Sequence, residues 1–202
     1  MPRGRRKGDH DSKREEIADA TCKVILRSGI EKSGIAEIAR EMGCSTGVLM
    51  HYFKTKAEML LYSKNLMFDR AHERMKQAAA NGHGPERLLA MTRELLPLDA
   101  ASIARCRLLT AFMGLAIGNP ALMKLQDKRD LLHIKQFAAV ITDLQATGTV
   151  SAKLDPMLEG RRICALIDGI ASQAATNPRS WSPADVEATM SRYLQSLMTS
   201  AA

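Results

Sequence analysis

The sequence is poor in aromatic residues and cysteine, and it has no long apolar run. Aromatic side chains make up 4% of the 202 residues, and the four cysteines form no CxxC pair. Scattered cysteines favour reduced thiols that act as small core residues, with redox sensing as the alternative, and argue against disulfides or a zinc site. The longest apolar run, Ala111 to Ile117, is too short to cross a bilayer, and the charged start lacks a secretory pattern. We therefore predict a cytoplasmic protein with no membrane partner.

Positive charge and apolar residues, by contrast, are plentiful. Hydrophobic residues make up 46% of the chain, enough for a substantial core, and the formal net charge is +7. Residues 1–14 carry six cations against two anions. A flexible basic arm of this kind suits phosphates or a minor groove, with Arg5 and Arg6 as candidate contacts, although the alternative is a merely solvating terminus.

Helix-start signals recur along the whole chain, and no stretch alternates with period two for long enough to predict a sheet. Ser12 with Glu15 and Thr55 with Glu58 fit the capping box, and four prolines that follow Gly, Asn, Asp or Ser mark four more starts. Apolar residues then recur at helical spacing. The expected helices cover residues 12–28, 34–42, 45–52, 55–80, 85–96, 101–117, 120–147, 156–176 and 183–199. The composition changes near residue 55, which predicts domains at 1–54 and 55–202.

The segment "EIAREMGCSTGVLMHYF" predicts a helix, a tight turn and a second helix. Gly43 can adopt the left-handed conformation that ends a helix, and Ser45 can cap the next one. Leu49 and Phe53, four residues apart, are expected to point into the core. The arrangement is a helix-turn-helix.

The opposite side of that short second helix carries Thr46, Gly47 and Met50, which are expected to face a major groove. Gly47 lowers helix stability and offers no side chain to pack, so its expected use is a close approach of the backbone to another molecule. The alternative is an ordinary helical hairpin in which Gly47 relieves crowding against a neighbouring helix.

Residues Ser12 to Leu60 resemble the DNA-binding domain of the TetR/AcrR family of one-component transcription regulators. The matching segments are "IADATCKVILRSGI" and "IAEIAREMGCSTGVLMHYFKTKAEML", with the spacing between them. The ending "ALIDGIASQAATNPRSW" is similar to the branch that includes the choline and betaine regulator. The resemblance implies an all-α fold of about nine helices, in which a three-helix helix-turn-helix DNA-binding domain precedes a larger helical ligand-binding and dimerisation domain.

The same resemblance implies roles for individual residues. Thr46, Gly47 and Met50 would approach base edges, while Tyr52 and Lys56 would contact phosphates. Position 46 is Thr where Lys is frequent and position 50 is Met where Tyr is frequent, so readout is expected to depend on thymine methyl groups and the basic arm. The full set of predicted DNA-binding residues is Arg5, Arg6, Ser33, Gly34, Ser45, Thr46, Gly47, Met50, His51, Tyr52 and Lys56.

The larger half is expected to enclose a cavity for a small-molecule effector and to form a homodimer. The candidate effector residues are Arg107, Thr110, Met113, His133, Phe137 and Asp168. Ordinary core roles remain the alternative for the methionines and His133. A surface or salt-bridge role remains the alternative for Arg107, and a dimer or core role for Asp168. Because the last two helices offer more apolar surface than one monomer can cover, a dimer interface is predicted. Its candidate residues are Ile163, Leu166, Ile167, Ile170, Val186, Met190, Tyr193, Leu194 and Leu197.

The predicted function is a transcriptional regulator, a repressor that binds double-stranded DNA at a near-palindromic operator as a dimer and is released by an effector. The alternatives are a helical small-molecule-binding or transport protein without specific DNA binding, and a regulator without an effector. An enzyme is not expected, because the sequence has no nucleophile–base motif, no HExxH and no glycine-rich phosphate loop. No cofactor or metal is predicted.

Overall fold

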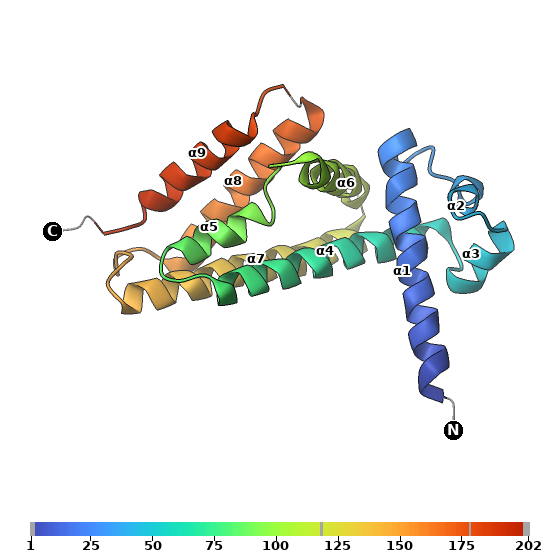
Figure 1. The fold of residues 1–202 in the computed structure, drawn as a ribbon, viewed down its shortest axis with the longest axis horizontal. Coiled ribbons are helices and arrows are strands. Elements are labelled where there is room, and N and C mark those ends of the chain that lie inside the picture. Colours follow the sequence, from blue (N-terminus) through green and yellow to red (C-terminus); the bar gives the residue numbers. More distant parts are fainter. Residues whose placement is uncertain (1–2, 118, 178, 200–202) are drawn as a thin grey trace. The chain divides into compact units, whose positions relative to one another are not determined.

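The structure, a computed structural model, describes residues 3–117, 119–177 and 179–199, and for residues 3–7, 121 and 125 it describes the backbone alone. These residues form nine helices and no strand, so the expected all-α fold is confirmed (Figure 1). An isolated antiparallel bridge joins Val150 to Met198. The helices are α1 (Arg3–Ser28), α2 (Ile35–Glu41), α3 (Thr46–Tyr52), α4 (Lys56–Asn81), α5 (Glu86–Arg93), α6 (Ala100–Ala116), α7 (Pro120–Ala146), α8 (Pro156–Thr176) and α9 (Pro183–Gln195).

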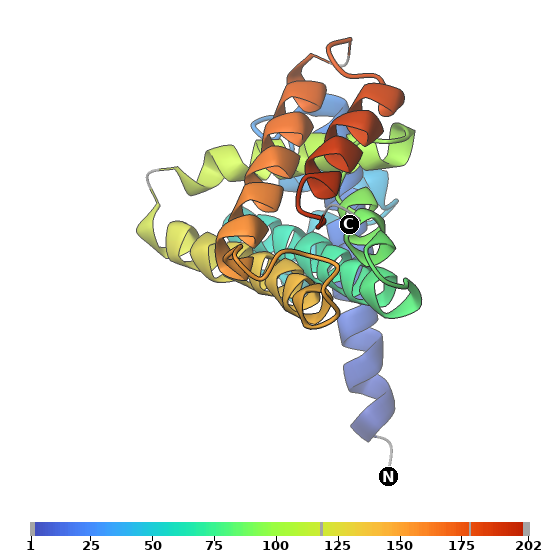
Figure 2. The same ribbon diagram turned by 90° about the vertical axis from the view of Figure 1, so that its left-hand side faces the viewer.

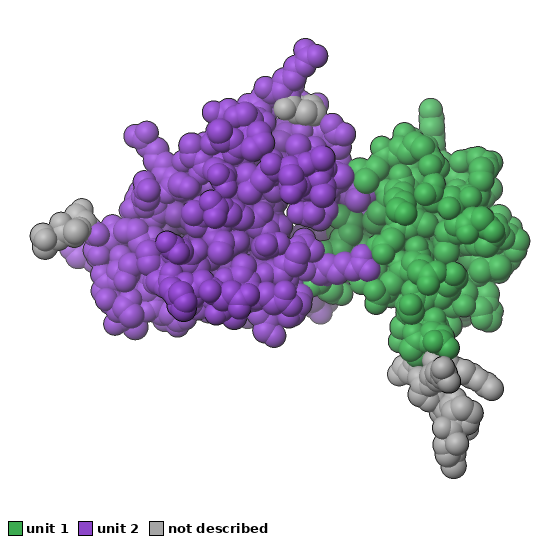
Figure 3. All heavy atoms as spheres, in the orientation of Figure 1, with its two compact units in different colours: residues 1–69 green, residues 70–202 purple. Residues whose placement is uncertain are grey.

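The helices divide into two compact units, residues 1–69 and 70–202 (Figure 3). In the N-terminal unit α1, α2 and α3 contact one another. In the C-terminal unit α8 contacts α6 and α7, and α5 contacts α7 and α9. The division falls within α4, which runs from Lys56 to Asn81. The domain boundary at residue 55 remains a prediction.

The helix starts follow the capping signals of the sequence. α7, α8 and α9 begin at the prolines that predicted them, and the preceding residues Asn119, Asp155 and Ser182 accept hydrogen bonds from first-turn amides. Thr55 Oγ1 likewise accepts a hydrogen bond of 3.0 Å from the amide of Glu58 at the start of α4. These short-range contacts satisfy amides that have no partner within the helix.

The first helix is longer than predicted. α1 begins at Arg3, whereas the sequence placed its start near residue 12 behind a flexible arm. Ser12 therefore lies inside the helix, where backbone carbonyls bond the amides that its side chain was expected to cap. The side chains of Arg5 and Arg6 lie outside the described residues.

The core of the C-terminal unit is built by side chains from α4, α5, α7, α8 and α9. It contains seven residues predicted for a dimer interface, namely Ile163, Ile167, Ile170, Val186, Met190, Leu194 and Leu197. Leu166 and Tyr193 are partly buried against the same core. The structure corrects this expectation, because the apolar stripes of α8 and α9 cover the core of their own subunit.

A buried carboxylate joins α8 to α9, which run side by side (Figures 1 and 2). Glu159 is only 1% exposed, and it accepts hydrogen bonds from the Tyr193 hydroxyl at 2.7 Å and from Arg162 Nη1 at 2.6 Å. Burial and the bond to Glu159 raise the pKa of Tyr193, so its hydroxyl remains a donor. The two donors offset the cost of burying the charge of Glu159.

The start of α8 lies close against the backbone of α7 at Gly160. A Cβ atom at this position would lie 2.7 Å from the carbonyl oxygen of Ile134 and 3.4 Å from its Cγ2. A backbone oxygen cannot move aside as the end of a flexible side chain can. The packing of α7 on α8 therefore requires glycine at position 160.

We expect Gly160→Ala to lower the free energy of unfolding by about 2 kcal/mol, as overpacked sites do. Gly114 in α6 supplies the control, since a Cβ there meets nothing within 4 Å. Gly114→Ala should leave stability unchanged or raise it by up to about 1 kcal/mol, the helix-propensity difference between the two residues. Urea unfolding of both variants makes the comparison, and equal stabilities would contradict this account of Gly160.

Candidate functional site

The helix-turn-helix predicted from the sequence is present in the N-terminal unit. α2 ends at Glu41, and Gly43 has a φ of 63°, the left-handed conformation that ends the helix. The Cys44 amide donates to the carbonyl of Ala39 at 3.0 Å, which closes the turn. Ser45 occupies the N-cap position of α3 with extended backbone angles, although its side chain makes no capping hydrogen bond.

One side of α3 is fixed to the core of this unit. Leu49 and Phe53 are 1% and 2% exposed and pack with Ile17 of α1 and Ile38 of α2. The prediction that both side chains point inward is confirmed. A seven-residue helix is too short to be stable alone, so these contacts determine its orientation.

The other side of α3 faces solvent. Thr46, Gly47 and His51 are exposed, and Met50 is 43% exposed. A Cβ atom at Gly47 would meet only Ser45 Oγ, at 3.7 Å, which is an ordinary contact distance. Relief of crowding against a neighbouring helix therefore does not explain this glycine. Thr46 and Gly47 form a surface of small residues with Met50 at its edge. These are the three residues expected to approach base edges.

Tyr52, the last residue of α3, lies half-buried beside this surface. Its ring centroid is 5.1 Å from that of His51, edge to face, and 4.9 Å from that of His10 in α1. Sequence reasoning did not include His10 in the site. The only signal was its spacing, because His10 precedes Ile17 by two helical turns and so shares its face of α1.

The loop before α2 is held by two of the predicted DNA-binding residues, Ser33 and Lys56. Ser33 is fully buried, and its hydroxyl donates to the Ile30 carbonyl at 2.6 Å. Lys56 Nζ lies 3.2 Å from the same carbonyl oxygen and 3.4 Å from that of Glu31. The Gly34 amide donates to the carbonyl of Lys32 at 2.9 Å. The structure thus corrects the role expected of the Ser33 hydroxyl, which cannot reach a phosphate from this buried position.

Arg14 is a second residue that the sequence did not single out. Its guanidinium carbon lies 4.6 Å from the ring centroid of Phe53 and 4.4 Å from that of Tyr62, and Nη2 lies 3.4 Å from Glu58 Oε1. Cation–π contacts and an ion pair therefore join α1 to the start of α4. Arg14 supports the helix-turn-helix from within.

The residues predicted to bind an effector do not gather in one described pocket. Phe137 is fully buried in the core, which corrects its assignment to a cavity wall. Arg107 is exposed and Thr110 is half-buried. Met113 lines a pocket of about 260 Å³ at the end of α6 and the start of α7, with Ala116, Ile117, Met123, Gln126 and Asp127.

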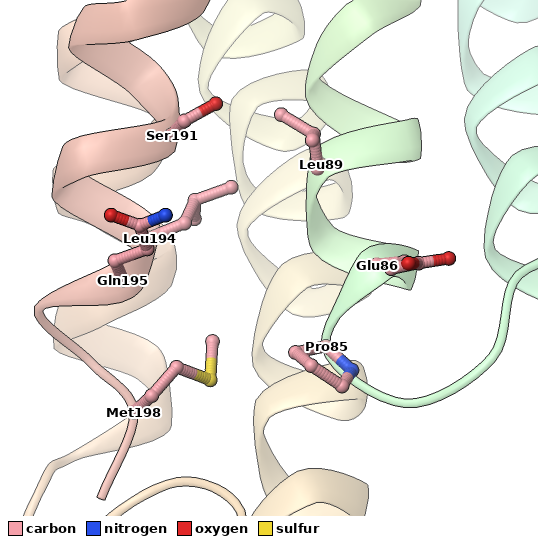
Figure 4. Close-up of a pocket in the computed structure, with 7 residues that line it drawn as sticks. All are labelled: Pro85, Glu86, Leu89, Ser191, Leu194, Gln195 and Met198. Atoms are coloured by element: carbon pink, nitrogen blue, oxygen red, sulfur yellow. The ribbon is translucent and has the colours of Figure 1, made fainter. Parts of the chain in front are cut away.

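A hollow of about 230 Å³ lies between α5 and α9 and contains none of the six predicted effector residues. It is lined by Pro85, Glu86, Leu89, Ser191, Leu194, Gln195 and Met198. Figure 4 shows Leu89 and Leu194 pointing into the space from opposite helices. The lining is mainly apolar, with few polar groups to orient a ligand.

Two titratable residues of the effector set have shifted pKa values. Burial, helped by His72 and Arg129, lowers the pKa of His133 to about 4, and the His133 and His72 rings stack with centroids 5.9 Å apart. Burial and the neighbouring Asp130 raise the pKa of Asp168 to about 6. Asp168 nevertheless keeps more than a third of its surface exposed, so water reaches it and moderates the shift.

The cysteines are free thiols in the structure, with Cys106 buried and the other three half-buried. Burial raises the pKa of Cys106 to about 11 and that of Cys164 to about 12, which leaves little reactive thiolate near neutral pH. No group of three His, Cys, Asp or Glu side chains in the described ranges is placed to hold a metal ion. Over the same ranges, no helix is both long and apolar enough to span a membrane.

An outward-facing helix within a helix-turn-helix defines a class of DNA-binding proteins. Residues 17–62 match the model of bacterial regulatory proteins of the tetR family, and residues 85–199 match the C-terminal domain of BetI-type transcriptional repressors. The chain belongs to the TetR family of transcriptional regulators.

Similar proteins agree with this assignment. The HTH-type transcriptional regulator PksA of Bacillus subtilis is 31% identical over 174 residues, which cover 84% of this chain and 82% of the relative. BetI of Escherichia coli K12 is 28% identical over 180 residues, which cover 83% of this chain and 85% of the relative. Both relatives are HTH-type transcriptional regulators.

Solved structures share the fold over nearly the whole chain. A transcriptional regulator from Rhodococcus sp. Rha1 has a TM-score of 0.81 at 25% identity and covers 91% of this chain and 95% of its own. A transcriptional regulator from Saccharomonospora viridis, solved in complex with choline, has a TM-score of 0.84 at 21% identity. The match covers 95% of this chain and 100% of that one.

His133 generates a prediction about acid stability. Its pKa lies below the ordinary histidine value in the folded chain, so the unfolded chain takes up the proton first as pH falls below about 6.5. Stability is therefore fully present above that pH and falls between about pH 6.5 and 4. We expect His133 to account for about 2 kcal/mol of the loss of unfolding free energy between pH 7 and pH 4.5.

Urea unfolding of His133→Gln at both pH values measures this contribution. The variant should lose less stability than the wild type on acidification. His83→Gln is the control, because His83 is exposed in the loop between α4 and α5 and should behave as the wild type. The account of His133 would be wrong if His133→Gln kept the full pH dependence.

Proposed function

We propose that this chain is a cytoplasmic repressor that binds a near-palindromic duplex operator as a homodimer and leaves it when a small-molecule effector binds. Gly47 is the observation that carries the DNA-binding part. The protein's own packing leaves room for a side chain at this position. Glycine has a lower helix propensity than alanine. A duplex pressed against the backbone of α3 supplies the reason for it.

The exposed side of α3 suits apolar base readout. The Met50 side chain and the Thr46 methyl can contact thymine methyl groups, which project into the major groove. The remaining proposed contacts position the protein on phosphates and sugars. They are Arg5, Arg6, Gly34, Ser45, His51, Tyr52 and Lys56.

The dimer is proposed to form through the outer faces of α8 and α9. These faces carry small exposed residues, including Ala165 and Gly169 on α8 and Ala184 and Ala188 on α9. Small side chains allow helices of two subunits to approach closely, and a two-fold axis presents the same surface from both. The two copies of α3 would then lie roughly 34 Å apart, the spacing of successive major grooves.

The effector is proposed to be an organic cation that binds near Asp168. The Saccharomonospora viridis regulator is in complex with choline, a quaternary ammonium ion. In this chain a cation would offset the repulsion between Asp168 and Asp130 that contributes to the raised Asp168 pKa. Near-complete release from DNA requires the effector to prefer the non-binding conformation by about 5 kcal/mol.

A charged side chain at Gly47 tests the DNA-binding surface. The position has room for a Cβ, so Gly47→Glu should fold normally but bind a duplex selected from a random pool by the wild-type protein at least 100-fold more weakly. Gly114→Glu makes the same charge change at an open position of α6 and should bind as the wild type. Fluorescence anisotropy at two salt concentrations measures both. Tight binding by Gly47→Glu would refute the proposed surface.

An arginine on the outer face of α9 tests the dimer. Ala188→Arg should convert a dimer into a folded monomer, because a large charged side chain would be buried against the partner. Ala139→Arg, on the exposed face of α7, is the matched control and should stay dimeric. Light scattering after size-exclusion chromatography gives both masses. A dimeric Ala188→Arg would place the interface elsewhere.

A further inference from the structure

The N-terminal half of α1 forms one wall of the site around Tyr52. α1 is continuous from Arg3 to Ser28, and Ile17 and Val24 of this helix are buried in the core of the N-terminal unit. His10 lies two turns before Ile17 and therefore extends the core-facing side of α1 beyond the core. At this point the helix meets the end of α3, where the His10 and Tyr52 rings are in contact.

The contact with the Tyr52 ring orients His10. The two ring centroids lie 4.9 Å apart with an interplanar angle of 42°, within the range of favourable aromatic pairs. His10 Nδ1 is 3.9 Å from the carboxylate of Asp11, which is longer than a hydrogen bond. The His10 and Asp11 side chains are 44% and 61% exposed, so this ion pair is weak.

Lys13 places a cation on the same side. It donates to Glu16 at 2.6 Å, and this bond raises the pKa of Lys13, with smaller contributions from Tyr52 and Cys44. The Tyr52 ring therefore has the two histidine rings of His10 and His51 in contact with it and Lys13 close by. Such a surface suits a polyanionic backbone.

The helical form of this segment also determines where it can bind. An α-helix with its side chains is about 10–12 Å across, whereas the minor groove of B-DNA is only about 6 Å wide. A helical α1 start therefore cannot enter that groove as a flexible arm would. It can lie across the sugar–phosphate backbone that borders the major groove.

We propose that His10 is a positioning residue of the DNA-binding surface, whose imidazole packs on Tyr52 and directs the Tyr52 hydroxyl to a backbone phosphate. This inference rests on the proposed function and adds α1 to the residues that determine affinity. Tyr52 already packs partly against the core of this unit, and the His10 ring lies against it as well. A restrained hydroxyl loses less conformational entropy when it bonds a phosphate.

A double-mutant cycle in the full chain tests the proposal, with the selected duplex described above as the probe. His10→Ala and Tyr52→Phe should each weaken binding about tenfold, the effect of losing one hydrogen bond to a charged group. The double variant should bind no more weakly than Tyr52→Phe, because no hydroxyl remains to be positioned. His10→Phe restores an aromatic ring and should bind within about twofold of the wild type.

His83→Ala, at the exposed histidine after α4, is the matched control and should bind as the wild type. Wild-type affinity of His10→Ala would overturn the proposal. So would additive losses in the double variant, a His10→Phe as weak as His10→Ala, or a loss of helix content in His10→Ala. If the wild-type protein selects no duplex at all, the proposed function fails. If the wild-type protein does select a duplex, and Gly47→Glu does not bind that duplex, any of the contradicting results above refutes only the role of His10.

Discussion

The proposed functional surface depends on the contact that Leu49 and Phe53, on the inner side of α3, make with the core of the N-terminal unit. A helix of seven residues has too few internal hydrogen bonds to persist alone, so tertiary contacts must hold it. Because Leu49 and Phe53 are used on the inner side, Thr46, Gly47, Met50 and His51 remain exposed on the outer side. The burial of the inner side thus determines the orientation of the outer side.

Local signals in the sequence predicted much of the fold. The prolines at 120, 156 and 183 begin helices because the ring fixes φ and the missing amide is not needed there. Gly43 ends α2 because glycine adopts positive φ without steric cost. The same reasoning failed at Ser12, where a capping pattern lies inside a longer helix. A cap is used only where the preceding residues do not continue the helix.

Features that depend on distant partners were not predictable in the same way. The apolar stripes of α8 and α9 are visible in the sequence, but periodicity cannot tell a subunit's own core from a partner's surface. Glu159 is buried because Tyr193, 34 residues later in the chain, donates to it. The contact of His10 with Tyr52 likewise joins two helices, and neither residue's sequence neighbours indicate it.

Lys56, the first residue of α4, can connect a bound duplex to the fold. An ammonium group has three N–H donors, and Lys56 places its nitrogen near the carbonyl oxygens of Ile30 and Glu31. One donor is then left for a phosphate. A phosphate would then be the third hydrogen-bond partner of Lys56. Lys56 already connects the loop before α2 to the start of α4, which extends to Asn81.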